Sequence, residues 1–555
     1  MMRNAIKARV LAILVTLGWI LTACTTTAAP TAAVAPSATP ATAPAATSTI
    51  TPSPSPTPLP GLWISPDLPA GFVLEVNPPA GLQVVGQKEE AAFLLMVSPD
   101  RPVSQWIYAL AAPFPTIADD ITGSDLVMLW GLEEPIDTLP YITRLLVDEN
   151  TRAVFTALWG EPGAMVQTLP GEELLNTAWE EKTAWAILPF QEIQPEWKVI
   201  QVDGISPLHK DFSPEGYALT VPVSLLGSRG ETESPSIGAV DWLPATNRDQ
   251  NKLTTVMLTG VTALVRATAA YMEIYGYTYP AEIIAPILQD GDILHVSNEI
   301  PFAEKCPRPG LGEQNGLVFC SRDVYIELLE FIGTDVVELT GDHFQDWGAE
   351  AMLHTLDLYD QRGWQTYGGG ANLEDARQPV LVEQNGNKIA FLGCNGKQPG
   401  YAQASPTQPG AYHCDLDWMA SEVQKLVSDG YLPIVTFQHE EYYETIARPA
   451  LQTDFRRMAE AGAVVVSGSQ AHQPHIFEFD NGALIHYGLG NLFFDQVNWC
   501  EACSSAFLDR HVFYDGQYLG VELITIRFED YARSRLTTPE ERQALLESVF
   551  AAGGW

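Results

Sequence analysis

The sequence predicts a layered α/β sandwich preceded by a smaller α/β domain. From Lys252 onward, short apolar runs alternate with amphipathic segments, as in sheets covered by helices. The 555 residues are enough for two or three domains. Residues 227–251 are rich in Gly, Ser, Pro and charge, which predicts a domain boundary. The predicted divisions are a leader at 1–24, a tether at 25–60, an accessory domain at 61–245, a main domain at 252–530 and a helical tail at 531–555.

The N-terminus has the pattern of a secretion signal. Arg3, Lys7 and Arg9 precede an apolar run at residues 10–21 that is too short to span a bilayer. The run ends in Leu-Thr-Ala-Cys, which resembles a bacterial lipobox with Cys24 as the lipidated residue. An ordinary signal peptide with an incidental Cys24 is the alternative. We therefore expect a protein outside the cytoplasm, held at the cell membrane by a lipid on Cys24 and a Thr/Ala/Pro/Ser-rich tether.

The charge of the chain excludes some partners. The formal net charge is −38 and the isoelectric point is near 4.4. A nucleic-acid partner is not expected, because there is no basic footprint. Binding of an anionic polymer by bulk electrostatics is excluded for the same reason. An anionic substrate would need local positive charge from an arginine, a helix N-terminus or a metal ion.

Six of the seven cysteines remain after Cys24, and an even number in an exported chain suggests disulfides. Several connectivities are possible, and pairing of nearest neighbours is the simplest. The last two cysteines also form a Cys-x-x-Cys sequence, for which a local staple is favoured over a redox role because no thioredoxin-like context surrounds it. The nearest-neighbour pairs are Cys306–Cys320, Cys394–Cys414 and Cys500–Cys503.

The accessory domain has the pattern of a mixed α/β domain. Strands are expected at residues 91–97, 153–159, 185–190 and 197–202, and a helix at 171–179. The last two strand segments faintly resemble a lobe of a periplasmic solute-binding protein. An unspecified α/β accessory domain is the equal alternative.

The main domain alternates strands and helices in a regular order. A hairpin is expected where Asn385-Gly386 joins two apolar runs. Strands are expected at 253–258, 293–296, 335–339, 380–383, 388–393, 432–437, 464–466 and 483–487, and helices at 279–288, 322–333, 349–362, 415–430 and 451–462.

Polar side chains follow these strands repeatedly, at the point where each strand ends. A lone histidine after a strand is more often structural than a ligand. Together, however, they supply oxygen and nitrogen ligands from five strand ends, which is the arrangement that a metal-hydrolase site needs. They are Asn298 and Glu299, Asp342 and His343, His439, His472 and His475, and Asn491.

Four segments, in order, resemble one family. Residues 335–348, DVVELTGDHFQDWG, resemble the pattern DVVxLANNHxxDxG. Residues 367–379, YGGGANLEDARQP, are similar to GAGxNLxEARxP, and residues 388–393 read KIAFLG as in the family. Residues 486–496, HYGLGNLFFDQ, resemble YSLGNFVFDQ. The chain is identified as a member of the CapA family of capsule or poly-γ-glutamate biosynthesis proteins, whose fold resembles calcineurin-like metallophosphatases.

The resemblance implies a site and assigns roles in it. A divalent metal would be held by a subset of the candidate ligands. The catalytic residues would be His343 as the general acid, Arg266, which would stabilise negative charge, and Asn298. Arg377 and Asn491 would bind substrate. In the family's opening motif, GDVMLGR, the Asp is a ligand, but Val261 stands at that position in residues 260–266, so that one metal or none is expected. The candidate metal ligands are Glu299, Asp342, His439, His472 and His475.

Two functions from different classes remain open. The first is a surface-anchored, metal-dependent hydrolase or transferase that acts on a phosphoester or peptide-like bond of a cell-envelope polymer or its precursor. The second is a polymer-binding or scaffold protein of the envelope with a degenerate site. Val261 favours the second, and the surviving histidines and Glu299 favour the first.

Overall fold

The computed structural model describes residues 58–136, 139–228, 240–310, 317–397, 400, 402–498 and 500–555. The chain divides into a short N-terminal unit, Met1–Pro58, and one compact unit, Leu59–Trp555. The expected leader, the lipidation site Cys24 and nearly all of the tether lie outside the described residues. Within the part that the structure describes, no helix has the length and apolar character needed to cross a bilayer.

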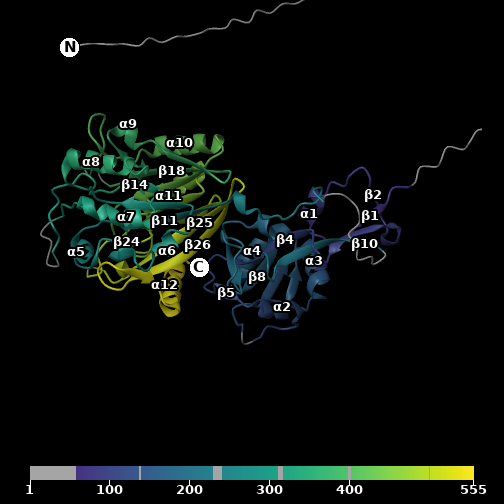
Figure 1. The fold of residues 1–555 in the computed structure, drawn as a ribbon. Coiled ribbons are helices and arrows are strands. Elements are labelled where there is room, and N and C mark those ends of the chain that lie inside the picture. Colours follow the sequence, from purple (N-terminus) through teal and green to yellow (C-terminus); the bar gives the residue numbers. More distant parts are fainter. Residues whose placement is uncertain are drawn as a thin grey trace, which may run out of the picture. The chain divides into compact units, whose positions relative to one another are not determined.

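The N-terminal part of the compact unit is built on one mixed sheet (Figure 1). Its strands follow the order β2-β1-β3-β10-β4-β8-β6-β7, and β9 pairs with β4 and β5. The strands are β1 (Gly61–Ile64), β2 (Gln83–Val84), β3 (Phe93–Val97), β4 (Ser104–Pro113), β5 (Asp120–Ile121), β6 (Arg144–Val147), β7 (Val166–Thr168), β8 (Ala184–Pro189), β9 (Trp197–Val202) and β10 (Thr220–Gly227), and the helices are α1 (Ala70–Glu75), α2 (Gly123–Gly131), α3 (Glu149–Trp159) and α4 (Gly171–Glu181).

The strand expected at residues 153–159 is wrong, because this segment is the second half of helix α3. The side chain of Asp148 caps the helix by accepting a hydrogen bond from the Thr151 backbone N–H. Thr151, Val154 and Phe155 are buried, which is the three- and four-residue spacing of a helix face. The apolar run alone is compatible with a strand, but the cap that precedes it decides for a helix.

The C-terminal part contains a nine-stranded sheet and a six-stranded sheet (Figure 1). The first runs β15-β14-β13-β11-β25-β26-β27, with β12 paired to β13 and β24 paired to β12, and the second runs β17-β18-β20-β21-β23-β22. The strands of the first sheet are β11 (Leu253–Thr259), β12 (Val261–Thr262), β13 (Ile293–Asn298), β14 (Val336–Glu338), β15 (Gln365–Tyr367), β24 (Asn491–Phe493), β25 (Ser505–Tyr514), β26 (Gln517–Phe528) and β27 (Ser534–Leu536). The strands of the second are β17 (Val380–Gln384), β18 (Asn387–Asn395), β20 (Leu432–Gln438), β21 (Val465–Ser467), β22 (Phe477–Asp480) and β23 (Ala483–His486).

The two sheets pack face to face, with helices on their outer faces. Strand periodicity explains this arrangement, since successive side chains point to opposite faces. On β11, Val256 belongs to the core between the sheets and Met257 to the core under the helices. On β20, Ile434 and Val435 divide in the same way. The layered α/β class is thereby confirmed. The outer helices are α5 (Arg266–Tyr275), α6 (Ala285–Leu288), α7 (Ile326–Ile332) and α8 (Gly348–Asp360) on one side, and α10 (Leu416–Ser428) and α11 (Pro449–Ala461) on the other.

Two expected helices differ from the structure. The segment 279–288 forms a 3₁₀ turn at Tyr279–Ala281 and the short helix α6, because Pro280 and Pro286 each lack a backbone donor. The tail is helical only from Pro539, where α12 (Pro539–Ala552) begins, and its first residues form β27 beside β26.

All three disulfides expected from nearest-neighbour pairing are present. They join Cys306 to Cys320, Cys394 to Cys414 and Cys500 to Cys503.

Candidate functional site

The candidate site lies at the carboxyl ends of parallel strands from both sheets of the C-terminal part. Strand β13 is parallel to β14, and β20 is parallel to β21. Side chains that follow these strands therefore gather at one edge. The loop after β14 comes very close to the end of β13, since a Cβ at Gly341 would lie 2.6 Å from the Glu299 backbone. Glycine at this position allows the two loops to meet.

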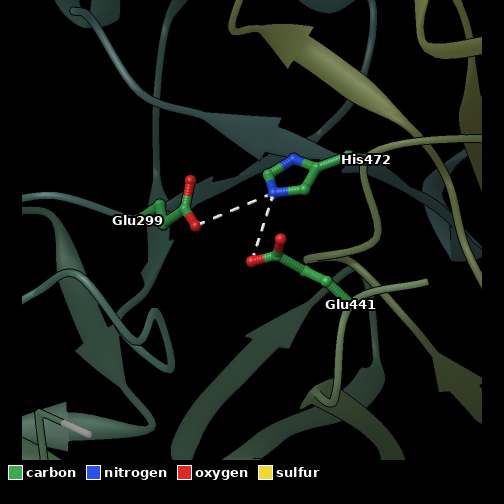
Figure 2. Close-up of side chains that lie close together, drawn as sticks. All are labelled: Glu299, Glu441 and His472. Carbon is green, nitrogen blue, oxygen red and sulfur yellow. Dashed lines mark ion pairs between the residues drawn. The ribbon is translucent and has the colours of Figure 1, made fainter. Parts of the chain in front are cut away.

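Three side chains from three loops converge there (Figure 2). His472 Nε2 lies 4.0 Å from Glu299 Oε1 and 3.7 Å from Glu441 Oε1. The ligand atoms of all three residues lie within 4.8 Å of one another. We call Glu299, Glu441 and His472 the Glu–Glu–His cluster.

Glu299 is the least satisfied member of this cluster. Its side chain is 1% exposed, and Oε2 has no hydrogen-bond partner among the described residues. Burial raises the pKa of Glu299 to about 7, with Asp342 and Glu441 adding to the rise and His472 and His343 opposing it. A buried carboxylate without a donor is costly unless a cation neutralises it.

The orientation of His472 suits a ligand. Its Nδ1 lies 2.9 Å from Asn491 Oδ1. Because the amide oxygen only accepts, Nδ1 carries the proton, and Nε2 faces the two carboxylates. Asn491 thus positions His472, whereas a substrate-binding role was expected for it. A ligating histidine usually has such a partner on its other nitrogen.

A second group of possible ligands shares Glu299 with the first. It consists of Glu299, Asp342 and His343. His343 Nδ1 lies 2.7 Å from Asp346 Oδ2. Burial lowers the pKa of His343, but the bond to Asp346 and the charges of Glu299 and Asp342 outweigh this and raise it to about 9. His343 is therefore protonated at neutral pH, as a general acid must be.

Lys397 lies between the two groups. Its Nζ is 2.6 Å from Asp342 Oδ2 and 2.8 Å from Glu441 Oε1. Sequence reasoning missed both Lys397 and Glu441. Both could have been found from the pattern of polar residues that follow strand ends, since Lys397 follows β18 by two residues and Glu441 follows β20 by three. Metal-site patterns favour histidine after a strand, however, and therefore point to His439 rather than to Glu441.

Two histidines expected as ligands have other partners. His439 Nε2 contacts Asp454 Oδ2 at 3.1 Å, although the residue lines the same pocket as His472. His475 stacks on Tyr442 with ring centroids 4.6 Å apart, and burial lowers its pKa to about 4. Neither is in a ligand group that the described residues form.

Asn298 and Arg377 are likewise held by local contacts. Asn298 is fully buried and donates a hydrogen bond to the Ile300 carbonyl, which orders the turn after β13. Arg377 forms an ion pair with Glu374, and its guanidinium lies 5.5 Å from the Trp418 ring centre. These contacts place neither side chain in the cluster.

Arg266 and Val261 border the cluster on its apolar side. The Arg266 guanidinium lies 4.7 Å from the Phe319 ring centre and 5.0 Å from that of Phe494. Phe494 also contacts the His472 ring, with centroids 5.2 Å apart. Val261 is fully buried in an apolar cluster with both phenylalanines. No oxygen ligand is available from the side chain at this position.

The residues present fit one divalent metal ion. Two carboxylates and an imidazole form a donor set that suits zinc, manganese or related ions. Oε2 of buried Glu299, which has no hydrogen-bond partner among the residues described, is a polar atom that such an ion would satisfy. The adjacent pocket has about 20 Å³ of free volume, enough for one water molecule.

These observations define the class as a layered α/β domain with a candidate metal centre at strand ends. Residues 251–496 match the family "Bacterial capsule synthesis protein PGA_cap". The chain therefore carries a domain of this family, in agreement with the CapA motifs of its sequence.

Curated relatives and solved structures are similar to parts of the chain. The capsule biosynthesis protein CapA of Bacillus anthracis is 24% identical over 310 residues, which is 55% of this chain and 75% of that protein. The PGA biosynthesis protein CapA of Bacillus subtilis is 27% identical over 198 residues, 34% of this chain and 50% of that protein. A phosphatase from Mycoplasma pneumoniae has a TM-score of 0.32 at 13% identity and covers 50% of this chain and 94% of its own. A 5'-nucleotidase precursor from Thermus thermophilus has a TM-score of 0.32 at 14% identity and covers 54% of this chain and 58% of its own.

Proposed function

We propose that this protein takes part in the synthesis or processing of a capsule or poly-glutamate-like exopolymer. Its family domain and its relatives, which are named for capsule and poly-glutamate biosynthesis, support this role. In this proposal the protein is a membrane-anchored lipoprotein outside the cytoplasm, and the C-terminal domain is a metal-dependent hydrolase or transferase acting on the polymer or its precursor.

The convergence of the Glu–Glu–His cluster is the observation that carries the catalytic part of the proposal. Glu299, Glu441 and His472 would hold one divalent cation. When bound, such a cation would supply a Lewis acid that acidifies water and polarises the phosphoryl or carbonyl group under attack.

The surrounding residues have complementary tasks. Asp346 accepts a hydrogen bond from Nδ1–H of His343 and keeps the imidazole protonated, so that Nε2–H can donate its proton to the leaving group as its bond breaks. Asn491 keeps Nε2 of His472 directed at the carboxylates. Arg266, held over two phenylalanine rings, would stabilise negative charge that develops on the substrate.

Metal analysis of the purified protein tests this proposal. After equilibration with Mn²⁺ or Zn²⁺ and removal of free ions, we expect about one metal ion per chain. The variant E299Q should lose it and lose hydrolysis of polymer or a phosphoester substrate, whereas E440Q, at an exposed neighbour of Glu441, should keep both. Wild-type protein without metal and without activity would contradict the catalytic role.

A scaffold or polymer-binding function is the second candidate, and Val261 favours it. An apolar cluster stands where the family pattern has an aspartate. Polymer binding that is unchanged in E299Q and after chelation, with no hydrolysis in either sample, would support the scaffold over the enzyme.

The proposed anchor has a separate test. Cys24→Ala should release the protein from the membrane fraction, because the lipid on Cys24 is its only proposed attachment. A Cys24→Ala protein that remains in the membrane fraction like the wild type would refute lipid anchoring without affecting the site.

A further inference from the structure

Lys397 contacts one carboxylate from each of the two ligand groups. Its ammonium binds Asp342 of the second group and Glu441 of the Glu–Glu–His cluster. We infer that Lys397 is a built-in cation that replaces a second metal ion, so that the centre takes one divalent ion only. This inference rests on the proposed function for its first ion and concerns a residue that neither the motifs nor the strand-end histidines indicated.

The hydrogen bonds of Asp342 explain why the second position is closed to a metal. Its Oδ2 lies 2.6 Å from Lys397 Nζ, and its Oδ1 accepts a hydrogen bond from Gln438 Nε2 at 3.2 Å. Both oxygens are therefore engaged. In the Glu–Glu–His cluster, by contrast, Glu299 Oε2 is unpartnered among the residues that the structure describes. A metal entering the second group would have to displace the ammonium, whereas an ion in the first would satisfy an oxygen that has no donor.

The backbone of Lys397 is fixed to the same edge of the sheet. Its N–H donates to Asn395 Oδ1 at 2.9 Å, and Asn395 Nδ2 donates to the Thr340 carbonyl at 2.8 Å. Asn395 is fully buried, and its neighbour Cys394 is in a disulfide with Cys414. Lys397 is thereby tied to the loop that carries Asp342. Its side chain is only 13% exposed, unlike that of a surface lysine.

Charge balance leads to the same stoichiometry. Glu299, Asp342 and Glu441 bring three negative charges when ionised, and Lys397 brings one positive charge. The positive charges of His343 and Arg266 are balanced by Asp346 and Asp495. The remainder equals the charge of a single divalent ion. Lys397 stays an ammonium, because carboxylate oxygens of both Asp342 and Glu441 lie within hydrogen-bond distance of its Nζ. Two divalent ions beside that ammonium would leave an excess of positive charge in a buried site.

The test compares metal stoichiometry in the wild type and in K397M. Titration calorimetry with Mn²⁺ and elemental analysis should give one equivalent for the wild type and two for K397M. K397R, which keeps the charge, should return to one. The double variant K397M/D342N should also bind one, because the second position then lacks its carboxylate. K388M is the matched control, since Lys388 is a surface lysine paired with Glu383, and should bind one.

The outcomes separate the role of Lys397 from the proposed metal-dependent function. Two equivalents in the wild type, or one in both the wild type and K397M, would overturn the role of Lys397 and leave a metal enzyme. None in the wild type and one in K397M would refute the proposed function and the single-ion stoichiometry, but would support Lys397 as a cation that keeps a metal ion out of its own position. None in either would overturn both. If K397M does not fold alone, refolding that succeeds only with excess Mn²⁺ supports the inference, and failure with and without it overturns the inference.

Discussion

Two buried carboxylate–histidine pairs in the C-terminal domain have the same chemistry and opposite surroundings. Glu338 and His295 lie between the two sheets, with Nε2 and Oε2 3.3 Å apart and both side chains fully buried. Glu299 and His472 lie at the strand ends, with Nε2 and Oε1 4.0 Å apart and side chains 1% and 3% exposed. Burial therefore does not distinguish them.

The supply of hydrogen-bond donors does distinguish them. Glu338 also accepts from the Thr340 hydroxyl at 2.6 Å and from the Ser469 hydroxyl. Burial tends to raise the pKa of Glu338, but these donors and His295 outweigh it, so that its pKa is lowered. Glu299 has an oxygen without a partner within the described chain, and its pKa rises to about 7. The satisfied carboxylate of Glu338 stabilises the fold, and the unsatisfied carboxylate of Glu299 is available for a ligand.

The largest expected effect on stability comes from replacing the Glu338 carboxylate. E338Q should lower the free energy of unfolding by about 3 kcal/mol at pH 7, because the charge is lost and an amide N–H₂ replaces one of the two acceptor oxygens that face buried donors. Since the pKa of Glu338 is lowered in the folded state, this stabilisation is present above the ordinary pKa of a glutamate and is lost as pH falls. Urea denaturation at pH 7 and pH 4 measures it. An equal effect at both pH values would argue against an ionised Glu338.

A new carboxylate at Val261 should also destabilise the fold. V261D places a charge in the apolar cluster around Phe319 and Phe494, at a cost of about 3 kcal/mol in metal-free protein. V261N, a polar side chain without the charge, is the control. A melting temperature and metal content that both rise in V261D would instead reveal a residual site one ligand short. Loss of stability with no gain of metal would indicate a cleft adapted to one ion or to binding alone.

Removing the charge of Glu299 should have the opposite effect to E338Q and V261D and should stabilise the metal-free fold. A rise in the pKa of Glu299 from 4.5 to about 7 costs about 3 kcal/mol of stability at pH 8, since one pKa unit corresponds to about 1.4 kcal/mol. The cost is absent below pH 4.5, grows as pH rises towards 7 and is constant above it. E299Q should therefore be more stable than the wild type at pH 8 with chelator, and equal to it at pH 4. A destabilised E299Q would show that Glu299 has a structural partner like that of Glu338.

The smallest expected effect is on His343. D346N removes the carboxylate that holds its Nδ1 proton, so that the pKa of His343 should fall from about 9 by roughly one unit. NMR titration of the imidazole measures this without any substrate. An unchanged titration would assign the raised pKa to Glu299 and Asp342 instead.

The sequence by itself determined the layered class, the order of most main-domain elements and the edge where the site forms. Apolar periodicity is local, and parallel strands bring their carboxyl ends to one edge whatever the loops do. For this reason the strand-end pattern is sufficient to indicate Glu299, Asp342, His343 and His472. The pairing of cysteines near in sequence followed from the chain in the same way.

Only the tertiary structure decided which side chains face the site. After β20, the sequence offers His439, Glu440 and Glu441, and the choice of Glu441 depends on distant partners: Asp454 on α11 holds His439, and Lys397 after β18 holds Glu441. The same is true of Glu338 and Glu299, which sequence cannot rank because their donors come from other strands and loops. Strand periodicity is set by neighbours along the chain, but hydrogen-bond satisfaction and charge pairing are set by residues brought together only by the fold.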